Sequence, residues 1–514
     1  MTRRFDAIVV GSGLGGLTAG ALYGRMGHRV LVLERNDGFG GAATVYQHDG
    51  LAIEASLHEI DGLDDGDAKT PLLQSLGLDR ELPFVDVGDL YEVRGPLIGA
   101  PFALPHGVDA AYGALVARFP QHGDALQAYF QRILAVREAV RFAGLHQDDP
   151  GWWLRHAPEA VRRAWPLLRE GRATLGETLT DLFGADEAVK VALAANLSYY
   201  HDDPDRLSFL SYAIPQASYL TGGGHYVRGG SAALSNRLVA LIREAGGIVE
   251  AGREVDTLLL DRVGVIGVRH RTRGGDDVMF DDAPVVFGNA APHRLAEMLP
   301  KAAREHFFKP YSRRPLSISL WTLSIGLRRP AREFGVGHYS TFILPAWMKA
   351  LSGLRESAAV MAEPDGGRIP AYAFVDYHQI DSGLNESGPY LGSFCGIDRL
   401  ENWAGLNVQQ KSERKERWME RLIADLDREF PGIAGAVVHR EMATAETLAH
   451  YLNTPDGAVY GFAPEGGLAE VFSFTPRTSV GGLWLASAYT FGGGFTGAML
   501  GGAEAARQAL KASR

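Results

Sequence analysis

Short apolar runs alternate with segments of mixed polarity at the start of the chain. Ala7–Val10 and Val30–Leu33 contain only apolar residues, and a glycine-rich turn with a helical-looking segment lies between them. Apolar runs of this length are typical of strands buried in a parallel sheet. The pattern therefore predicts a strand, a tight turn, a helix and a second strand.

The pattern changes after about residue 65. Asp124–Gly144 and Ala157–Phe183 mix charged and apolar residues over lengths that favour helices. Ser231–Ala245 carries apolar residues at helical spacing and predicts a further helix. We therefore expect a mainly helical region to separate the first strands from the next ones.

Strand patterns return after this helix. Ile248–Glu250, Glu254–Leu260 and Val263–Arg269 alternate in polarity, and Asp261-Arg262 is a plausible hairpin turn between the last two. Pro284–Ala290 predicts one more buried strand. The short apolar strands seen at the start of the chain thus resume in its middle.

The segment Val480–Ala503 has no charged residue and is long enough to span a bilayer. Its many glycines leave few large apolar side chains. We therefore expect a strand at Leu483–Ala486, a glycine loop, and a helix from about Phe495 in place of a membrane span.

These patterns predict two kinds of domain built from separated pieces. One domain takes residues 1–65, 225–292 and 442–514, and the other takes the inserted segments 66–224 and 293–441. A chain of 514 residues is too long for one simple core, which agrees with two joined domains.

Composition narrows the class of protein. The net charge of -10 argues against a nucleic-acid partner, because a basic surface is needed to attract phosphates. The single cysteine, Cys395, excludes an intrachain disulfide, a cysteine-rich zinc site and an iron–sulfur cluster. Arg3-Arg4-Phe5 precedes the first strand and is not interpreted as an export signal, so we expect a cytoplasmic protein.

The first turn reads Gly11-Ser12-Gly13-Leu14-Gly15-Gly16. Its first glycine permits a sharp turn, its second lets the backbone approach a pyrophosphate, and its last allows the helix to pack closely on the strand. The helix N-terminus stabilises phosphate charge. Glu34 ends the second strand, where an acid accepts ribose hydroxyls. Together with Gly40-Gly41-Ala42, this arrangement predicts a dinucleotide-binding site.

The motifs resemble those of the phytoene dehydrogenase-like family of FAD-dependent oxidoreductases, which includes carotenoid desaturases, carotenoid isomerases and retinol saturases. The similarity runs in order through Val9–Gly20, Gly40–Ala42, Tyr226–Ser231, Thr454–Gly461 and Gly482–Gly502. It implies an α/β fold: a Rossmann-type FAD-binding domain, similar to glutathione reductase and amine oxidases, with an inserted mixed α+β substrate domain. No second glycine motif of this kind follows a strand, so we expect no separate NAD(P) domain.

The saturase-like subgroup has the closest signature, aromatic-Asp-x-Gly-apolar-His. The same place here reads Ile53-Glu54-Ala55-Ser56-Leu57-His58, so Glu replaces Asp and Ser replaces Gly. The tail departs further, because relatives carry Gly-Asp or Gly-Gln against the ribityl chain and this chain carries Ser487-Ala488. The resemblance thus implies that one ribityl hydrogen bond is missing, with Tyr489 or Thr490 as a substitute.

The resemblance also implies further cofactor contacts. Arg35 follows the ribose-binding acid, and Val255 lies in the strand with which the family holds adenine by backbone bonds, although a merely packed valine is the alternative. Phe495 and Thr496 follow three glycines at a helix N-terminus, which would stabilise negative charge on the flavin. The alternative there is a plain glycine loop.

His58 is the catalytic candidate. An imidazole near the flavin could orient substrate or carry a proton, and a hydrogen-bonded structural histidine is the alternative. The cluster Ser198–Pro204 combines aromatic and acidic residues and could line a pocket, but acids before a proline favour an exposed turn. No metal-ligand spacing stands out, and we expect no metal.

We expect hydride exchange between FAD and a carbon–carbon unit of a hydrophobic, isoprenoid-like substrate, with oxygen or a quinone as electron partner. The sequence does not fix the direction, since the electron partner decides it. An amine or amino-acid oxidase is the alternative, with Arg313-Arg314 or Tyr199–Asp203 as substrate anchor, and an FAD-bound scaffold is a third. Tyr339–Leu354 could contact a membrane peripherally, although a packed helix is favoured.

Overall fold

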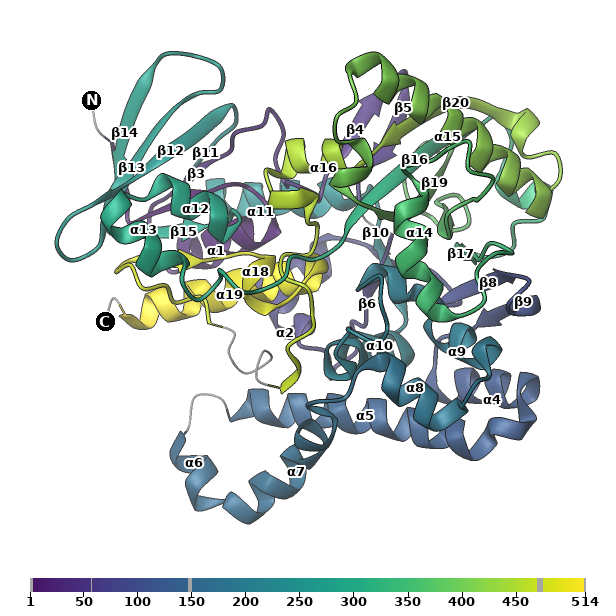
Figure 1. Cartoon of the computed structure of the whole chain (residues 1–514). Coiled ribbons are helices and arrows are strands. Elements are labelled where there is room, and N and C mark those ends of the chain that lie inside the picture. Colours follow the sequence, from purple (N-terminus) through teal and green to yellow (C-terminus); the bar gives the residue numbers. More distant parts are fainter. Residues whose placement is uncertain (1–2, 57, 147–149, 469–474, 513–514) are drawn as a thin grey trace.

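The computed structural model describes residues 3–56, 58–146, 150–468 and 475–512. A five-stranded parallel sheet in the order β11-β3-β2-β15-β21 forms its Rossmann-type half (Figure 1). The strands are β2 (Ala7–Val10), β3 (Val30–Leu33), β11 (Ile248–Glu250), β15 (Val285–Gly288) and β21 (Leu483–Leu485). The sequence predicts a strand at each of these places, and the α/β fold class is confirmed.

Both faces of this sheet are buried, because successive side chains point to opposite sides. Ala7 and Val9 share one core with the helices on the first face, and Ile8 and Val10 belong to the core on the second. The helices of the first face are α1 (Leu14–Arg25), α2 (Lys69–Leu76), α11 (Ser231–Glu244) and α19 (Gly494–Ala512). This two-sided burial explains why the strands are apolar throughout.

A four-stranded sheet in the order β1-β14-β13-β12 contributes to the second core. Its strands are β1 (Arg3–Arg4), β12 (Arg253–Leu260), β13 (Val265–Thr272) and β14 (Val278–Asp282), and α12 (Pro292–Met298) and α13 (Lys301–Phe308) lie nearby. The predicted turn joins β12 to β13. There the Asp261 Oδ1 atom accepts hydrogen bonds from the backbone N–H groups of Val263 and Gly264, at 2.7 and 2.9 Å.

The other half contains a seven-stranded mixed sheet in the order β20-β16-β19-β18-β17-β8-β9. Its strands are β8 (Tyr91–Gly95), β9 (Gly99–Leu104), β16 (Ser319–Leu327), β17 (Ser340–Ile343), β18 (Tyr372–Asp376), β19 (Tyr390–Asp398) and β20 (Val437–Ala443). Helix α15 (Val408–Glu429) packs Trp418 into the core beside Trp321 of β16. Helices α14 (Leu354–Val360) and α16 (Ala445–Leu452) complete this side.

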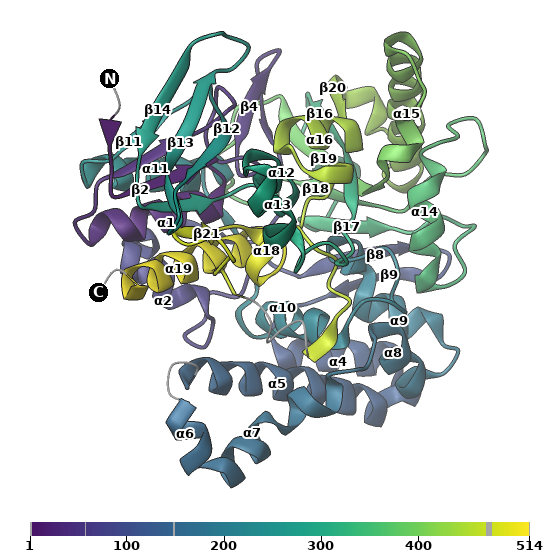
Figure 2. The ribbon, with the colours of Figure 1, turned by 60° about the vertical axis from the view of Figure 1, so that its left-hand side comes forward.

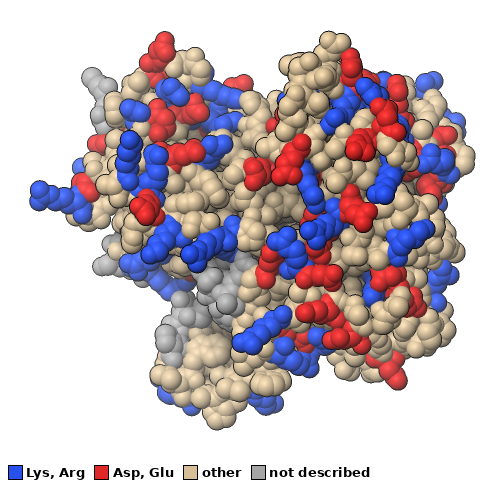
Figure 3. Space-filling model, viewed as in Figure 1, with Lys and Arg blue, Asp and Glu red and all other residues tan. Residues whose placement is uncertain are grey.

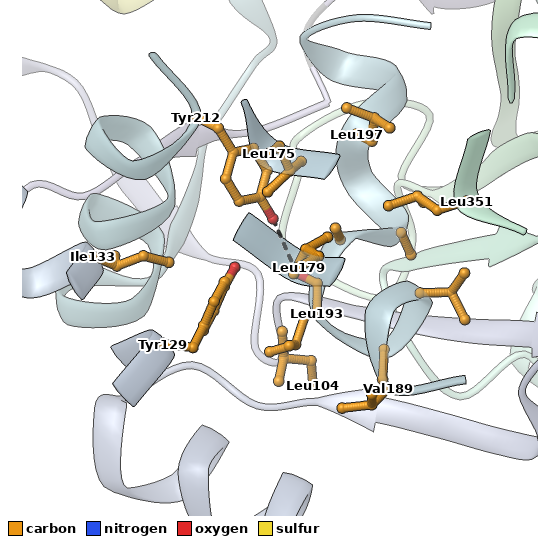
Figure 4. Packing of buried hydrophobic residues seen from close by; sticks show 14 of the residues in the cluster. Leu104, Tyr129, Ile133, Leu175, Leu179, Val189, Leu193, Leu197, Tyr212 and Leu351 are labelled. Atoms are coloured by element: carbon orange, nitrogen blue, oxygen red, sulfur yellow. Dashed lines mark hydrogen bonds between the residues drawn. The ribbon is translucent and has the colours of Figure 1, made fainter. Parts of the chain in front are cut away.

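Helices from the first insertion pack below this sheet (Figure 2). They are α4 (Val108–Arg118), α5 (Gly123–Leu145), α6 (Pro150–Arg155), α7 (Ala157–Glu170), α8 (Leu175–Phe183), α9 (Glu187–Ala194) and α10 (Phe209–Gly222). Figure 4 shows their core, in which the buried Tyr212 hydroxyl donates to the Leu193 carbonyl at 3.0 Å among leucines of α8 and α9. The phenol hydroxyl therefore has a hydrogen-bond partner although it lies inside an apolar core.

The predicted helix Ala157–Phe183 is two helices. Gly171 ends α7, and a Cβ atom at this position would lie 2.8 Å from both the Leu167 carbonyl oxygen and the Leu468 side chain. Thr174 then starts α8 with a capping box, in which Thr174 and Glu177 exchange hydrogen bonds. Gly171 and the Thr174 cap interrupt the helix locally, and the helical spacing of the apolar residues does not reveal this interruption.

Two small sheets connect the halves. Strands β6 (Ile60–Asp61), β10 (Gly224–Val227) and β7 (Phe84–Asp86) form one, and the hairpin of β4 (Val45–His48) and β5 (Leu51–Glu54) forms the other. The hairpin and β6 follow closely on the second glycine pair, whereas β10 comes from the middle of the chain. The predicted boundaries of the two domains stay a prediction.

The segment Tyr339–Leu354 differs from the predicted helix. It begins with β17 and ends with a short turn at Leu351–Gly353. Phe342, Ile343 and Leu344 are each 3% exposed, so the segment is packed as favoured, and the alternative of a membrane contact through these side chains is excluded. Strand pairing on both sides of β17 overrides the apparent helical spacing.

The tail contains a short helix where a loop was expected. Helix α18 (Ala488–Phe491) follows β21, and α19 then begins at Gly494, beside the predicted start. No helix in the described parts of the chain combines the length and the apolar character that a bilayer span requires.

Candidate cofactor and substrate site

The glycine turn after β2 is held by close backbone approaches. Gly11 has φ +93°, and a Cβ atom at Gly13 would lie 2.5 Å from Asn289 Nδ2. A Cβ at Gly15 would lie 2.4 Å from the Ala486 carbonyl oxygen, and one at Gly16 would lie 2.6 Å from the Gly11 carbonyl oxygen. The glycines therefore allow the turn to meet β15 and β21 at the ends of their strands.

The second glycine pair lies directly on this turn. The Gly40 N–H donates to the Ser12 carbonyl at 3.0 Å, and a Cβ at Gly41 would lie 3.3 Å from Gly13 Cα. Gly40 and Gly41 both have positive φ, at 105° and 62°. Ala42 follows, and its carbonyl accepts a hydrogen bond from Ser56 Oγ at 2.7 Å. The structure thus brings the two predicted glycine motifs together.

Glu34 is buried at the end of β3. Its Oε2 atom accepts from the Ser12 N–H at 2.8 Å and from Ser12 Oγ at 2.7 Å, and its Oε1 atom accepts from the Asn36 N–H at 2.7 Å. A carboxylate can accept about four hydrogen bonds. The side chain is therefore fixed in place with acceptor capacity left over.

Arg35 and Val255 lie beside this acid. The Arg35 Nε atom is buried with no hydrogen-bond partner among the described residues, although Nη2 donates to the His450 carbonyl. Burial lowers the pKa of the Arg35 guanidinium. Val255 lies on β12, an edge strand whose first residue donates its N–H to the Glu34 carbonyl at 2.6 Å. Glu34, Arg35 and Val255, the predicted nucleotide contacts, therefore lie beside the edge strand β12.

The tail contributes to the other end of the site. Ala488 is the first residue of α18, and Phe495 and Thr496 lie in the first turn of α19. Thr490 Oγ1 bonds to the Leu485 carbonyl at 3.1 Å, which engages its hydroxyl locally. Ser487 Oγ and Tyr489 OH are both buried without a hydrogen-bond partner in the described part of the chain. Of the two predicted substitutes, only Tyr489 keeps an unengaged hydroxyl.

A hydrogen bond ties α19 to the segment that carries His58. The Thr496 hydroxyl donates to Asp61 Oδ1 at 3.0 Å, and Asp61 lies in β6, three residues after His58. Lys69 Nζ lies 3.4 Å from the same oxygen of Asp61. The N-terminal turn of α19 is therefore bonded to the segment that carries the catalytic candidate. Leu57, in the same segment, lies outside the described residues.

His58 lies deep in the protein. Its Nδ1 atom is 3.1 Å from the Tyr199 hydroxyl, and the Tyr339 hydroxyl donates to its carbonyl. Burial lowers the pKa of the imidazole to about 4. By its exposure the residue as a whole is half-buried. At neutral pH, His58 is uncharged.

Glu59 is a functional candidate that sequence reasoning missed. Burial raises the pKa of its carboxyl to about 8, the nearby Asp61 charge adds to this shift, and a hydrogen bond from Tyr219 opposes it. Its Oε2 atom is buried without a hydrogen-bond partner in the described residues. The carboxyl is thus mainly protonated at neutral pH, and one oxygen has nothing to bond to.

Tyrosines surround this carboxyl. After the larger effect of burial, the Glu59 charge also contributes to raising the pKa values of nearby phenols, among them those of Tyr199, Tyr200, Tyr219 and Tyr339. Tyr460 joins them and lies against the glycine loop before α19, where a Cβ at Gly493 would be 2.4 Å from Tyr460 Cβ. We call His58, Glu59 and these five tyrosines the tyrosine cluster.

The predicted cluster Ser198–Pro204 divides between the two interpretations. Tyr199 and Tyr200 point into the tyrosine cluster, while a turn does begin at Pro204. The acids are not exposed, since Asp203 is 6% exposed and Asp202 pairs with Arg399 at 3.0 Å. An acid sequence before proline could not reveal that Arg399, from the second inserted segment, pairs with it.

The comparisons with known proteins agree with this geometry. A family described as "NAD(P)-binding Rossmann-like domain" matches residues 9–76. All-trans-retinol 13,14-reductase from Homo sapiens is 25% identical, covering 97% of this chain and 84% of its own length. Prolycopene isomerase from Daucus carota is 21% identical, covering 90% of this chain and 73% of its own.

The fold is also similar to that of solved structures. Cyclohexylamine oxidase from Brevibacterium oxydans has a TM-score of 0.61 at 18% identity, covering 99% of this chain and 100% of that chain. This similarity confirms the predicted Rossmann-type architecture. The matches over nearly the whole sequence also confirm the predicted resemblance to the phytoene dehydrogenase-like family: the chain is a homologue of retinol 13,14-reductases and prolycopene isomerases.

Proposed function

We propose that this chain is a FAD-dependent oxidoreductase that exchanges hydride with a carbon–carbon unit of a hydrophobic polyene. The observation that carries the proposal is the tyrosine cluster beside the N-terminal turn of α19. Aromatic rings and uncharged titratable groups suit an apolar substrate. The relatives, a retinol reductase and a prolycopene isomerase, support a substrate of this chemical class.

The residues present fit FAD. The turn Gly11–Gly16 and the pair Gly40-Gly41 with Ala42 leave backbone open for a pyrophosphate, as a glycine turn at a helix N-terminus does. Glu34 has acceptor capacity for ribose hydroxyls, and Arg35 has an unbonded Nε. The edge of β12 at Val255 offers backbone groups for adenine.

The flavin end of the group would lie against the tail. Ala488 and the first turn of α19, with Phe495 and Thr496, would contact the ring, where a helix N-terminus favours negative charge. The buried Ser487 Oγ and Tyr489 OH are suitable partners for the ribityl chain. FAD, when bound, supplies a hydride acceptor or donor to the substrate.

Two neighbouring residues would manage the accompanying proton. Glu59 holds a proton at neutral pH and can give it to a substrate carbon in saturation, or take one up as carboxylate in desaturation. His58 is neutral and bonded to Tyr199, which suits it to orient Tyr199 and the substrate. We assign the transfer of the proton to Glu59 and a positioning role to His58.

Flavin spectroscopy tests the proposal. The purified protein, supplied with FAD, should show flavin absorption bands, and polyene alcohols should bleach them without oxygen. Oxygen or a soluble quinone should restore the bands. An absence of flavin bands after addition of FAD would overturn the cofactor assignment, and bleaching by amines alone would overturn the substrate class.

An amine oxidase is the second candidate. The specific observation is Glu59, because a buried carboxyl could pair with a substrate ammonium group. The predicted anchors are less suitable: Arg314 lies over the Phe462 ring, and Asp202 is paired with Arg399. Hydrogen peroxide released from a panel of amines, but not from polyenes, would favour this candidate.

We further propose that helices α6 and α7 rest on an anionic membrane surface, from which a hydrophobic substrate could enter. Large apolar side chains are exposed on these helices and at the adjoining end of α5: Leu145, Leu154, Val161, Trp165 and Leu168. Residues 150–172 contain five arginines and two glutamates, in a chain with a net charge of -10. Apolar side chains flanked by arginines are typical of interfacial helices. Figure 3 shows this projection, at the lower left, as mostly uncharged surface.

Vesicle binding tests this surface. Sedimentation with vesicles that contain anionic lipid should capture the wild-type protein, and Trp165→Glu with Leu168→Glu should reduce capture about tenfold or more. Val263→Glu is the matched control, since Val263 is 87% exposed at a distant hairpin. Equal capture of both variants would overturn the assignment, and a change of oligomeric state in the double variant alone would identify a self-association face.

A further inference from the structure

Two histidines and a glutamate from distant segments meet at one edge of the seven-stranded sheet. His48 ends β4, while His439 and Glu441 lie on the edge strand β20. The His48 Nδ1 atom lies 3.5 Å from His439 Nε2 and 3.5 Å from Glu441 Oε2. All three ligand atoms lie within 4.8 Å of one another. These residues have no part in the proposed reaction.

We propose that His48, His439 and Glu441 form a binding site for a divalent transition-metal ion, with Zn²⁺ as the best match. Tetrahedral zinc with bonds of about 2.0–2.1 Å places neighbouring ligand atoms about 3.3 Å apart. The two 3.5 Å separations are close to that value. Imidazole nitrogens and a carboxylate oxygen are ligands that zinc takes in proteins.

A fourth ligand is available beside them. The Asp49 Oδ2 atom lies 3.8 Å from His48 Nδ1, and the Asp49 side chain is exposed. This carboxylate or a water molecule could supply the fourth ligand of a tetrahedral site.

The backbone at the hairpin end fixes His48. Asp49 and Gly50 form a two-residue turn with φ of 47° and 80°, which is the type I′ geometry that Asp-Gly prefers. On β16, Gly326 lies opposite His439, and a Cβ there would be 3.1 Å from His439 Cβ and 3.3 Å from Leu51 Cδ2. The glycine thus makes room for the hairpin end to reach β20.

Neighbouring polar groups orient the ligands. The Tyr46 hydroxyl donates to Glu441 Oε2 at 3.2 Å, from the same face of β4 as His48. The Asn385 side chain bonds to both backbone groups of Ala52, at 3.0 and 2.7 Å, and anchors the hairpin. Partners of this kind hold the ligands of known metal sites in position.

Zinc would join two parts of the chain that are far apart in sequence. The hairpin follows the second glycine pair, whereas β20 is the edge of the seven-stranded sheet (Figure 1). A ligand that binds only the folded chain stabilises it in proportion to the logarithm of its free concentration. Zinc should therefore raise the melting temperature of the whole protein.

Calorimetric titration of the full chain with zinc chloride, after removal of metal with EDTA, tests the site. We expect one zinc ion per chain and a melting temperature that rises with zinc concentration. His48→Ala, His439→Ala and Glu441→Gln should each weaken zinc binding at least about tenfold. His306→Ala, which removes an exposed histidine of α13, should not change it.

The metal-free melting temperatures separate loss of the site from loss of the fold. Each variant should melt within about 2 °C of the metal-free wild type, because the changed side chains are exposed or half-buried. Unchanged zinc affinity in both histidine variants would overturn the proposal. So would wild-type binding that is no tighter than that of the double variant His48→Ala/His439→Ala.

Discussion

The nucleotide end and the substrate end of the site are built in opposite ways. At the nucleotide end, glycines bring backbone segments together, and the Glu34 carboxylate accepts three hydrogen bonds. At the substrate end, the Glu59 Oε2 atom is buried without a partner in the described residues, and burial shifts the pKa values of Glu59 and His58. The nucleotide end has most of its polar groups bonded within the protein, with Arg35 Nε as an exception, whereas the substrate end holds titratable groups whose charged forms burial disfavours.

The difference indicates where chemistry takes place. A buried polar atom without a partner costs roughly 1–3 kcal/mol, so such atoms are rare in a stable fold. Among the described residues, Glu59 Oε2, Ser487 Oγ and Tyr489 OH are three of the buried polar atoms that lack a partner, and all three lie near the predicted flavin end of the site. A bound cofactor and substrate would supply their missing partners, which predicts that the ligand-bound protein is the more stable form.

The largest effect on cofactor binding should come from the nucleotide end. Gly13→Val should weaken FAD binding about 100-fold or more, equal to about 2.8 kcal/mol, because the side chain would occupy the path of the pyrophosphate. Fluorescence titration with FAD measures the affinity. Gly435→Val is the control, since a Cβ at Gly435 meets no atom within 4 Å.

Asn289 provides a sharper test of the same glycine, because it is the residue that a Cβ at Gly13 would touch. If Gly13 is needed only for that contact, Gly13→Ala/Asn289→Ala should bind FAD as the wild type does. We expect the double variant to stay defective. Full recovery would show that the glycine serves the fold and not the cofactor.

At the substrate end, Glu59→Gln should slow flavin reduction or reoxidation by substrate about 10²–10⁴-fold, the usual scale of general acid–base catalysis. FAD binding should be unchanged, because Glu59 lies away from the nucleotide turn. Anaerobic stopped-flow absorbance measures the rate. The exposed Glu363→Gln is the control, and a wild-type rate in Glu59→Gln would end the proton assignment.

The pH profile tests the same carboxyl without a mutation. Because the folded pKa of Glu59 is about 8, above its ordinary 4.5, the protonated form should decrease as pH rises through 8. The saturation rate should fall in that range, and the stability that the raised pKa contributes, full below about 4.5, should be lost by pH 8. Glu59→Gln should lack both changes. A flat wild-type profile between pH 6 and 9 would contradict the assignment.

His58 should have a smaller effect. His58→Ala should slow the reaction roughly 10–100-fold, since it removes the partner of Tyr199 and not the proton donor. His58→Gln should recover most of this loss by hydrogen bonding. A loss as large as that in Glu59→Gln, with no recovery in His58→Gln, would make His58 the proton carrier and reverse the two roles.

The smallest effect should come from Cys395. Burial raises the pKa of its thiol to about 12, so at neutral pH it is neither a nucleophile nor a metal ligand. Thiol reagents should label the unfolded protein but not the native one, and Cys395→Ser should stay within about twofold of the wild-type rate. Rapid labelling of the native protein would contradict the buried geometry.

Most of the nucleotide half could be predicted because its signals are local. Ala7–Val10, Val30–Leu33 and Ile248–Glu250 are strands with the predicted limits, since both faces of the sheet are buried and short apolar runs suffice. The glycine turn and Glu34 likewise depend on neighbours within one unit. The helix predicted for Tyr339–Leu354 was wrong, because strand pairing with distant segments determines the structure of this stretch.

The substrate end could not be predicted in the same way. Glu59 directly follows His58, yet nothing in its neighbourhood along the chain marks it. Its environment comes from Tyr219 on α10, Tyr339 before β17 and Tyr460 after α16, and burial by these segments is what raises its pKa. The metal ligands His48 and His439 are likewise far apart in sequence.

The arrangement of the Rossmann-type sheet has a consequence for synthesis of the chain. Strand β2 is made first, but β15 separates it from β21, and α1 packs against α19 at the far end of the sequence. A growing chain therefore exposes the apolar face of α1 until about residue 500 has emerged. Folding should be late and slow, because contacts between distant segments form last. We expect chaperone binding to the nascent chain to end only when α19 is released.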